Sequence, residues 1–114
     1  MTSAREMVFQ RLMHRLTGGV PRFATVADTL AVSSRTLSRR LADEGTTYRQ
    51  VVDEARAAMA AALLDDPHLS LTEVAYLLGY ADPSSFTHAH KRWTGEPPQS
   101  RRAAPLNGRR RAAS

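Results

Sequence analysis

The sequence has no cysteine, which excludes disulfide bonds, thiolate zinc sites and cysteine nucleophiles. No apolar run approaches the about 20 residues that a membrane-spanning helix requires, and the first residues lack the apolar core of a secretory signal. Only seven residues are aromatic, too few to favour stacking on single-stranded nucleic acid. A length of 114 residues suits one compact domain, or two very small lobes that share a helix, and leaves no room for a large α/β enzyme. Without a membrane or secretory segment, we expect a soluble, cytoplasmic protein.

Positive charge is concentrated at the C-terminal end. The chain carries 16 Lys and Arg against 11 Asp and Glu, a net charge of +5. Five arginines follow Ser100 with no acidic residue among them, so residues 1–100 are neutral overall. The Ala, Pro, Gly and Arg composition of residues 103–114 predicts an Arg-rich disordered tail. A nucleic-acid site therefore needs a local basic face on the folded part of the chain.

Helix signals recur along the sequence, whereas runs that alternate apolar and polar residues, as strands do, are nearly absent. Three capping patterns precede apolar stripes at helical spacing: Ser3-x-x-Glu6, Thr47-x-x-Gln50 and Ser70-x-x-Glu73. Thr25, Ser33 and Asp82 are candidate caps of three further helices, the last followed by Pro83, which suits the first position of a helix. These signals predict an all-α fold.

An internal repeat is the most informative feature of the sequence. Val26-Ala27-x-x-Leu30-Ala31 matches Val74-Ala75-x-x-Leu78-Gly79 at a spacing of 48 residues, and the segments that follow align after one inserted residue. Each copy predicts a short helix, a tight turn and a second helix, which is a helix-turn-helix. Gly79 in the second turn allows a positive φ, while Ala31 in the equivalent position lacks that freedom.

The second helix of each copy presents a polar face. With Leu37 and Leu41 inward, the opposite face carries Arg35, Ser38 and Arg39. The equivalent residues of the second copy are Ser84, Thr87 and His88, with Lys91 one turn further. An α-helix fits the major groove of DNA, where Arg binds the O6 and N7 atoms of guanine. A long helix between the copies would let both second helices enter major-groove segments about 34 Å apart.

Between about Val26 and Arg102 the sequence resembles the DNA-binding domain of AraC/XylS-type transcription regulators. Three motifs carry the resemblance: Ser-x-Arg-Thr-Leu-x-Arg-Arg-Leu from Ser33, Leu-x-Glu-Val-Ala-x-x-Leu-Gly-Tyr from Leu71 and Lys-Arg-Trp-x-Gly-x-x-Pro from Lys91. It implies about seven helices in two helix-turn-helix subdomains joined by a long central helix. Within a DNA-binding domain of residues 1–102, we expect a first lobe at about 3–45, a linker helix at about 47–65 and a second lobe at about 70–102.

The resemblance also implies a function and its residues. We expect sequence-specific binding to double-stranded promoter DNA, activation through RNA polymerase and no cofactor, in the cytoplasm and on the nucleoid when bound. The family often adds a domain for effector binding or dimerisation, for which this chain has no room. Positions that match base contacts of the family are Arg35, Ser38, Arg39, Pro83, Ser84, Thr87 and His88. Candidate phosphate contacts are Thr25, Arg40, Ser70 and Lys91, with plain solvation equally open for Arg40.

The second copy departs from the family pattern at three positions. His90 stands where a buried Phe is usual, His88 where an exposed Arg is common, and Arg101 where an aromatic residue is expected. These changes give the second lobe a more polar core and a weaker cationic face. We therefore expect the first lobe to carry more of the sequence specificity.

Other functions fit the sequence less well. His88 and His90 point about 200° apart on a helix and cannot share one metal ion. Ser33, Ser34 and Ser38 have no histidine or aspartate at workable helical spacing, and the acidic residues are scattered, so we expect no enzymatic activity. A simpler alternative is that Arg35 and Arg39 are solvated charges paired with Asp43 and Glu44. The repeat and the family pattern favour base contact over this alternative. The functional alternative is a helical protein-interaction adaptor whose non-specific DNA affinity comes from its basic tail.

Overall fold

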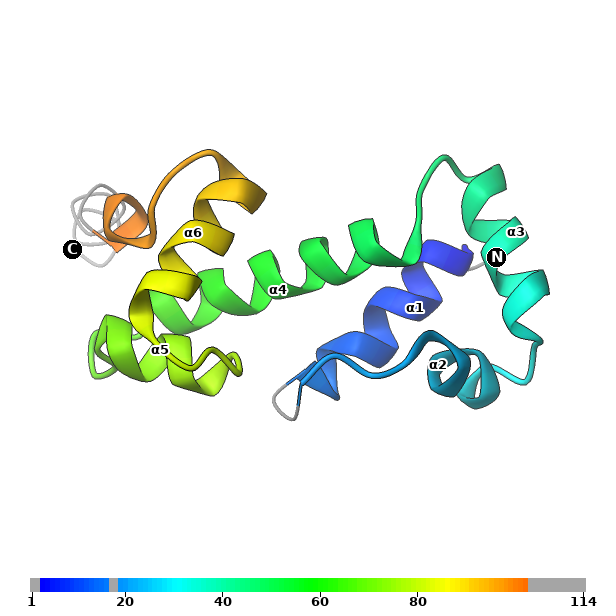
Figure 1. Cartoon of the computed structure of the whole chain (residues 1–114), viewed down its shortest axis with the longest axis horizontal. Helices are drawn as coiled ribbons and strands as arrows, with labels where there is room; N and C mark the ends of the chain where they lie inside the picture. The colour runs from blue at the N-terminus through cyan, green and yellow to red at the C-terminus, as the bar shows by residue number, and fades with distance from the viewer. Residues whose placement is uncertain (1–2, 17–18, 103–114) are drawn as a thin grey trace, which may run out of the picture. The chain divides into compact units, whose positions relative to one another are not determined.

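The computed structural model describes residues 3–16 and 19–102, and within these residues every regular element is helical, as predicted (Figure 1). Six helices are followed by a helical segment at residues 98–102. The helices are α1 (Ala4–Met13), α2 (Phe23–Thr29), α3 (Ser34–Asp43), α4 (Tyr48–Leu64), α5 (Leu71–Leu77) and α6 (Pro83–Thr94). The predicted disordered tail, residues 103–114, lies outside the described residues.

The chain forms two compact units that divide between Arg56 and Ala57, inside α4. The first unit contains α1, α2, α3 and the first half of α4. The second contains the rest of α4, then α5, α6 and the helical segment at 98–102. Each unit therefore includes one of the two predicted helix-turn-helix copies, α2 with α3 and α5 with α6, and the long central helix takes part in both.

The core of the first unit is built around α3, which packs against both α1 and α2. Leu37 and Leu41, the two inward positions predicted for α3, are each 1% exposed. Full burial of a leucine side chain stabilises a fold by about 1.5–3 kcal/mol, so these two residues fix which side of α3 faces the core. Further buried side chains of this unit come from the other three helices: Ala4, Val8, Leu12, Val26, Ala27, Val51, Val52 and Ala55.

The core of the second unit is more aromatic. Phe86 of α6 is 1% exposed and lies 5.8 Å from Tyr80 and 6.4 Å from Trp93, measured between ring centroids. Tilted rings at these separations pack favourably. The buried residues that complete this cluster come from α4 and α5: Ala60, Leu64, Val74, Ala75 and Leu78. Trp93 is therefore part of the core of this unit.

Most helix starts follow the predicted caps, and one does not. In the capping patterns at Thr47 and Ser70, the N-cap hydroxyl accepts from the N–H three residues later, and the side chain of that residue accepts from the N-cap N–H. The prediction that Thr25 caps the second helix is wrong, because α2 begins three residues earlier than expected, with Arg22 as its N-cap. Phe23, the first residue of α2, packs on the ring of Tyr48 at 4.9 Å. This aromatic contact favours the earlier start, and Thr25 lies in the first turn of the helix.

The two turns confirm the internal repeat at the level of single hydrogen bonds. In the first copy the N–H of Val32 donates to the carbonyl oxygen of Ala27 at 3.2 Å. In the second, 48 residues later, the N–H of Tyr80 donates to the carbonyl oxygen of Ala75 at 3.0 Å. Both bonds close the C-terminal end of the first helix over a residue with positive φ. The same turn therefore links both helix pairs.

Candidate nucleic-acid interface

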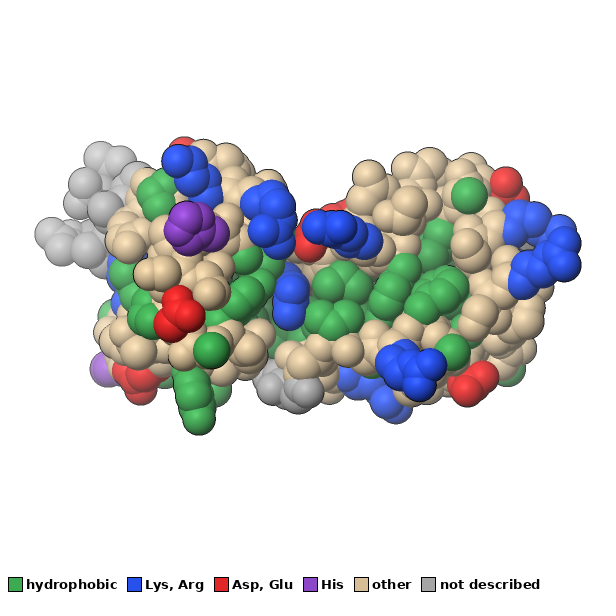
Figure 2. Space-filling view, in the orientation of Figure 1, with side chains coloured by type: hydrophobic (Ala, Val, Ile, Leu, Met, Phe, Trp, Pro, Cys, Tyr) green, Lys and Arg blue, Asp and Glu red, His purple; other side chains and the backbone are tan. Residues whose placement is uncertain are grey.

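The first candidate reading helix is α3, whose outward side is polar and basic. Ser33 caps it by accepting a hydrogen bond from the N–H of Thr36 at 3.1 Å. Arg35, Ser38 and Arg39 are all exposed on the side opposite the buried leucines, as predicted from their spacing. Figure 2 shows Lys and Arg side chains gathered over α3 with an acidic side chain beside them.

Local salt bridging does not occupy the arginines of α3. Within residues 3–16 and 19–102, neither Arg35 nor Arg39 forms an ion pair with Asp43 or Glu44. The Glu44 carboxylate instead accepts hydrogen bonds from the backbone of α1. The guanidinium groups of α3 therefore face solvent, where they can bind a carbonyl-rich or anionic partner.

The second candidate reading helix is α6, in which Pro83 is the first residue. Pro83, Ser84 and His88 are exposed, while Thr87 is half-buried and so less accessible than predicted. Lys91 is exposed near the C-terminal end of the helix. Over α6, Figure 2 shows a histidine side chain close to Lys and Arg side chains. This face offers hydroxyl and imidazole groups where α3 offers guanidinium groups.

A negative charge stands at the N-terminal end of α6. Asp82 caps the helix, and its carboxylate accepts hydrogen bonds from the Ser85 N–H at 2.8 Å and the Ser85 hydroxyl at 3.1 Å. These bonds, together with the nearby charge of His88, lower the pKa of the Asp82 carboxyl below its usual value. The neutral Ser33 occupies the same place in α3. The two candidate reading helices thus differ in charge at their N-terminal ends. The sequence indicated Asp82 only as the start of a helix.

The candidate phosphate contacts lie at the surface of both units. Thr25 on α2, Arg40 on α3 and Lys91 on α6 are exposed. Ser70 is exposed as well, but its hydroxyl accepts from the N–H of Glu73 at 3.0 Å in a capping box. Its own hydroxyl proton remains available to donate to a phosphate oxygen.

His90 is a packed core residue, as predicted for this departure from the family pattern. It is 3% exposed, and its ring stands edge-on to Phe86 at 5.8 Å. Its Nδ1 donates to the carbonyl oxygen of Glu96 at 2.7 Å and lies 3.3 Å from the hydroxyl of Thr94. The polar ring that His90 brings into the core of the second unit therefore has its hydrogen-bond partners at the end of α6 and just after it. Among the described residues, no group of three His, Asp or Glu side chains could hold a metal ion.

Two of the C-terminal arginines belong to the fold. Arg101 pairs with Asp65 at 3.1 Å. Arg102 donates from Nε to the carbonyl oxygen of Leu64 at 3.2 Å and from Nη2 to that of Asp66 at 3.1 Å. Carbonyl groups at the end of a helix lack intrahelical partners, so Arg102 caps α4. The sequence places both residues in the second lobe but does not indicate these contacts, because their partners are more than 30 positions away.

An apolar surface on α5 also escaped prediction. Leu77, grouped with the apolar positions of its helix, is 41% exposed, and the neighbouring Tyr76 is 77% exposed. Their side chains line a shallow groove together with Leu69 and Glu73. Searching the described helices for one long and apolar enough to cross a membrane finds none.

Comparisons with known proteins agree with this geometry. Residues 26–104 match a family model described as a helix-turn-helix domain. The HTH-type transcriptional regulator VqsM of Pseudomonas aeruginosa is 47% identical over 76 residues, covering 67% of this chain and 23% of that protein. The solved transcriptional regulator CdpR of the same species has a TM-score of 0.70 at 48% identity, covering 89% of this chain and 34% of that chain.

One of the solved structures contains nucleic acid. The DNA-binding domain of the global transcriptional factor AdpA, in complex with a target DNA, has a TM-score of 0.72 at 26% identity. The match covers 95% of this chain and 97% of that domain. By contrast, this chain spans about a quarter of the length of VqsM.

Proposed function

The chain belongs to the AraC-type helix-turn-helix family of transcriptional regulators, and from this premise we propose that it reads specific sequences in double-stranded DNA with two helices, α3 and α6, placed in adjacent major-groove segments. The observation that carries the proposal is the duplicated helix-turn-helix. Each copy buries the apolar side of its second helix and exposes the polar side. A packed helix with an accessible polar face is what groove recognition requires.

In this proposal α3 supplies the stronger base contacts. Arg35 and Arg39 are exposed one turn apart, and each guanidinium can donate two parallel hydrogen bonds to O6 and N7 of a guanine. Ser38 lies between them on the same face and can donate to, or accept from, a base edge. We expect the half-site read by α3 to contain at least one guanine that Arg39 recognises.

Recognition by α6 follows a different chemistry. Ser84, Thr87 and His88 provide hydrogen-bond donors, and Pro83 provides an apolar surface for a thymine methyl group. The Asp82 carboxylate at the start of the helix repels phosphate and accepts only from exocyclic amino groups such as N4 of cytosine. We infer that α6 contributes less binding free energy than α3 and that its half-site tolerates more sequence variation.

Backbone contacts supply affinity without sequence information. Thr25, Arg40, Ser70 and Lys91 are exposed and carry hydroxyl or cationic groups that suit phosphate oxygens. Because the first hundred residues are neutral overall, we expect moderate affinity and a modest dependence on salt for this domain.

The wider role is proposed from family likeness. We propose that the chain acts on promoter DNA in the cytoplasm and activates transcription through contact with RNA polymerase. The AdpA domain, which is similar in fold, was solved on a target DNA. Since this chain spans about a quarter of VqsM, effector binding or dimerisation would belong to a further domain.

In vitro selection from a randomised duplex library, at near-physiological salt, tests the proposal. Enrichment of two short motifs about one helical turn apart is the expected result. A single enriched motif would mean that α6 holds only the DNA backbone. If no motif is enriched and binding disappears as salt rises, the adaptor hypothesis with a non-specific basic tail replaces this one.

A further inference from the structure

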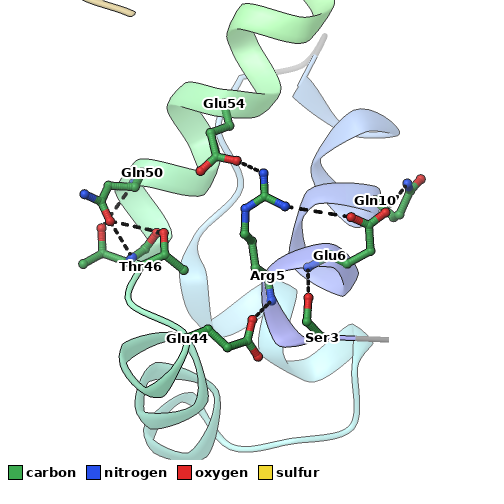
Figure 3. A network of polar contacts seen from close by, with 9 residues as sticks. Ser3, Arg5, Glu6, Gln10, Glu44, Thr46, Gln50 and Glu54 are labelled. Atoms are coloured by element: carbon green, nitrogen blue, oxygen red, sulfur yellow. Dashed lines mark hydrogen bonds and ion pairs between the residues drawn. The ribbon is translucent and has the colours of Figure 1, made fainter. Parts of the chain in front are cut away.

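A single carboxylate joins the end of α3 to the start of α1 (Figure 3). Glu44 follows α3 directly and is its C-cap residue. Its Oε2 accepts from the N–H of Ala4 at 2.8 Å, and its Oε1 accepts from the N–H of Arg5 at 2.9 Å. These N–H groups belong to the first turn of α1 and have no partner within the helix. Both carboxylate oxygens are therefore engaged by one rigid element.

The same end of α1 is held to α4. The Arg5 guanidinium forms an ion pair and hydrogen bond with the Glu54 carboxylate. Figure 3 shows Arg5 between Glu44 on one side and Glu54 on the other. Ala4 and Val8 of α1 are buried, so the helix is also anchored by apolar packing. The C-terminal end of α3 is thus connected through α1 to α4.

The apolar side of α3 packs against α1 and α2, and Glu44 adds a polar contact at the C-terminal end of the helix. Its buried contacts come from Leu37 and Leu41, one turn apart on one face, which fix the side of the helix that faces the core. They constrain the tilt of a helix of ten residues much less. A carboxylate that accepts two hydrogen bonds at the end of the helix adds a constraint on this tilt. Recognition of base edges requires side chains held within about half an ångström, so the tilt of α3 decides whether Arg39 reaches its base.

In the described part of the second unit, residues 57–102, no carboxylate takes the place of Glu44. At the spacing of 49 that aligns α3 with α6, the position of Glu44 corresponds to Trp93, a core residue. The chain after α6 is instead held through Thr94, Glu96 and His90. Moreover, α1 precedes the segment that the family model matches, residues 26–104. An effect of Glu44 on recognition should accordingly be confined to α3.

We propose that Glu44 is a positioning residue for base recognition, holding the reading face of α3 at the angle that the groove requires. The proposal rests on the function proposed above. The hydrogen bond from the Arg5 N–H lowers the pKa of the Glu44 carboxyl, so the group is ionised near neutral pH and accepts at both oxygens. Neutralisation to an amide replaces one acceptor by an NH2 group facing an N–H donor.

The test compares Glu44→Gln with Glu6→Gln in the full chain. Glu6 lies on α1 within the same network, and its carboxylate accepts from Gln10 and pairs with the Arg5 guanidinium at 4.0 Å, so both of these partners lie on α1 and neither on α3. Three duplexes are used. The first is the selected sequence, and the second carries a change in the half-site where Arg39→Ala weakens the base preference. The third carries a change in the other half-site. Affinities are measured by fluorescence anisotropy at a temperature where circular dichroism shows all variants folded.

For Glu44→Gln, the preference for the selected sequence over the first altered duplex should fall about three- to tenfold, while the preference at the other half-site stays within about twofold. Glu6→Gln should match the wild type at both. Equal losses at both half-sites, or an unchanged preference at the first, overturn the proposal while leaving the proposed function in place. A wild-type chain that prefers no duplex overturns both. If Glu44→Gln does not fold, Glu44→Asp, which keeps the charge but shortens the reach, takes its place with the same expectations.

Discussion

Ala31 and Gly79 occupy the same position in the two turns and share a left-handed backbone, with φ of 58° and 90°. Ala31 has the only positive φ of a non-glycine residue in the part of the chain that the structure describes. A residue with a Cβ atom strains in this conformation, and glycine does not. The two copies therefore adopt the same turn geometry, but the backbone strain is greater in the first copy, at Ala31.

Ala31→Gly is expected to raise the free energy of unfolding by about 0.5–1 kcal/mol, because relief of strain exceeds the greater entropy of glycine in the unfolded chain. Urea denaturation followed by circular dichroism measures the change. Gly79→Ala is the reciprocal control and should cost about 1 kcal/mol. A Cβ atom at Gly79 meets no atom within 4 Å, so its cost is backbone strain alone. Destabilisation by Ala31→Gly would show that the turn is not strained.

Arg39→Ala is expected to weaken binding to the selected duplex by about 1–3 kcal/mol and to relax the preference at one base pair. The reason is the loss of a two-point contact between guanidinium and guanine. Titration against a panel of duplexes, each with one base pair changed, measures both effects. A uniform loss across the panel would instead make Arg39 a phosphate contact.

Lys91→Ala should weaken binding to all duplexes evenly. Removal of one phosphate contact lowers the slope of log K against log salt by about 1. Affinities at several salt concentrations, measured with selected and unrelated duplexes, give this slope. A change of base preference without a change of slope would place Lys91 among the base-reading residues.

Acid should lower the free energy of unfolding of both units, because it protonates the carboxylates that cap their helices. The pKa values of Glu44, Glu73 and Asp82 are lowered in the folded chain, chiefly by hydrogen bonds from backbone N–H groups. Their contribution to stability is complete above the ordinary carboxyl pKa of about 4 and is lost as the pH falls through the lower, folded values. Urea midpoints measured between pH 7 and pH 2.5 should decrease once the pH is below about 4, where these carboxylates become protonated. The decrease should be smaller for Glu44→Gln, which lacks one of the three carboxylates. A decrease as large as that of the wild type would contradict the contribution assigned to Glu44.

Much of the fold was predictable because its signals are local. The repeat, the caps at Ser33, Ser70 and Asp82, and the inward leucines of α3 each depend on residues within one or two helical turns. The exposed face of α3 follows from the same periodicity. These features need no knowledge of which helices pack together.

The rest depends on contacts between distant parts of the chain. Glu44 meets α1 across about 40 positions, and Arg102 meets the end of α4 across 38 and 36. Phe23 on Tyr48 shifted the start of α2 away from Thr25. No periodicity or motif indicates such pairs, so the partners of Arg101 and Arg102 were not predicted, and Glu44 was expected to pair with the arginines of α3 instead of with α1.

The central claim is that α3 and α6 each read their own half-site, and selection with two reading-face variants tests it most directly. One variant replaces Arg35, Ser38 and Arg39 by alanine, and the other replaces Ser84, Thr87 and His88. The account predicts that each variant loses one of the two wild-type motifs and keeps the other, with the greater loss of affinity in the α3 variant. Loss of both motifs in either variant, or retention of both in each, would contradict it.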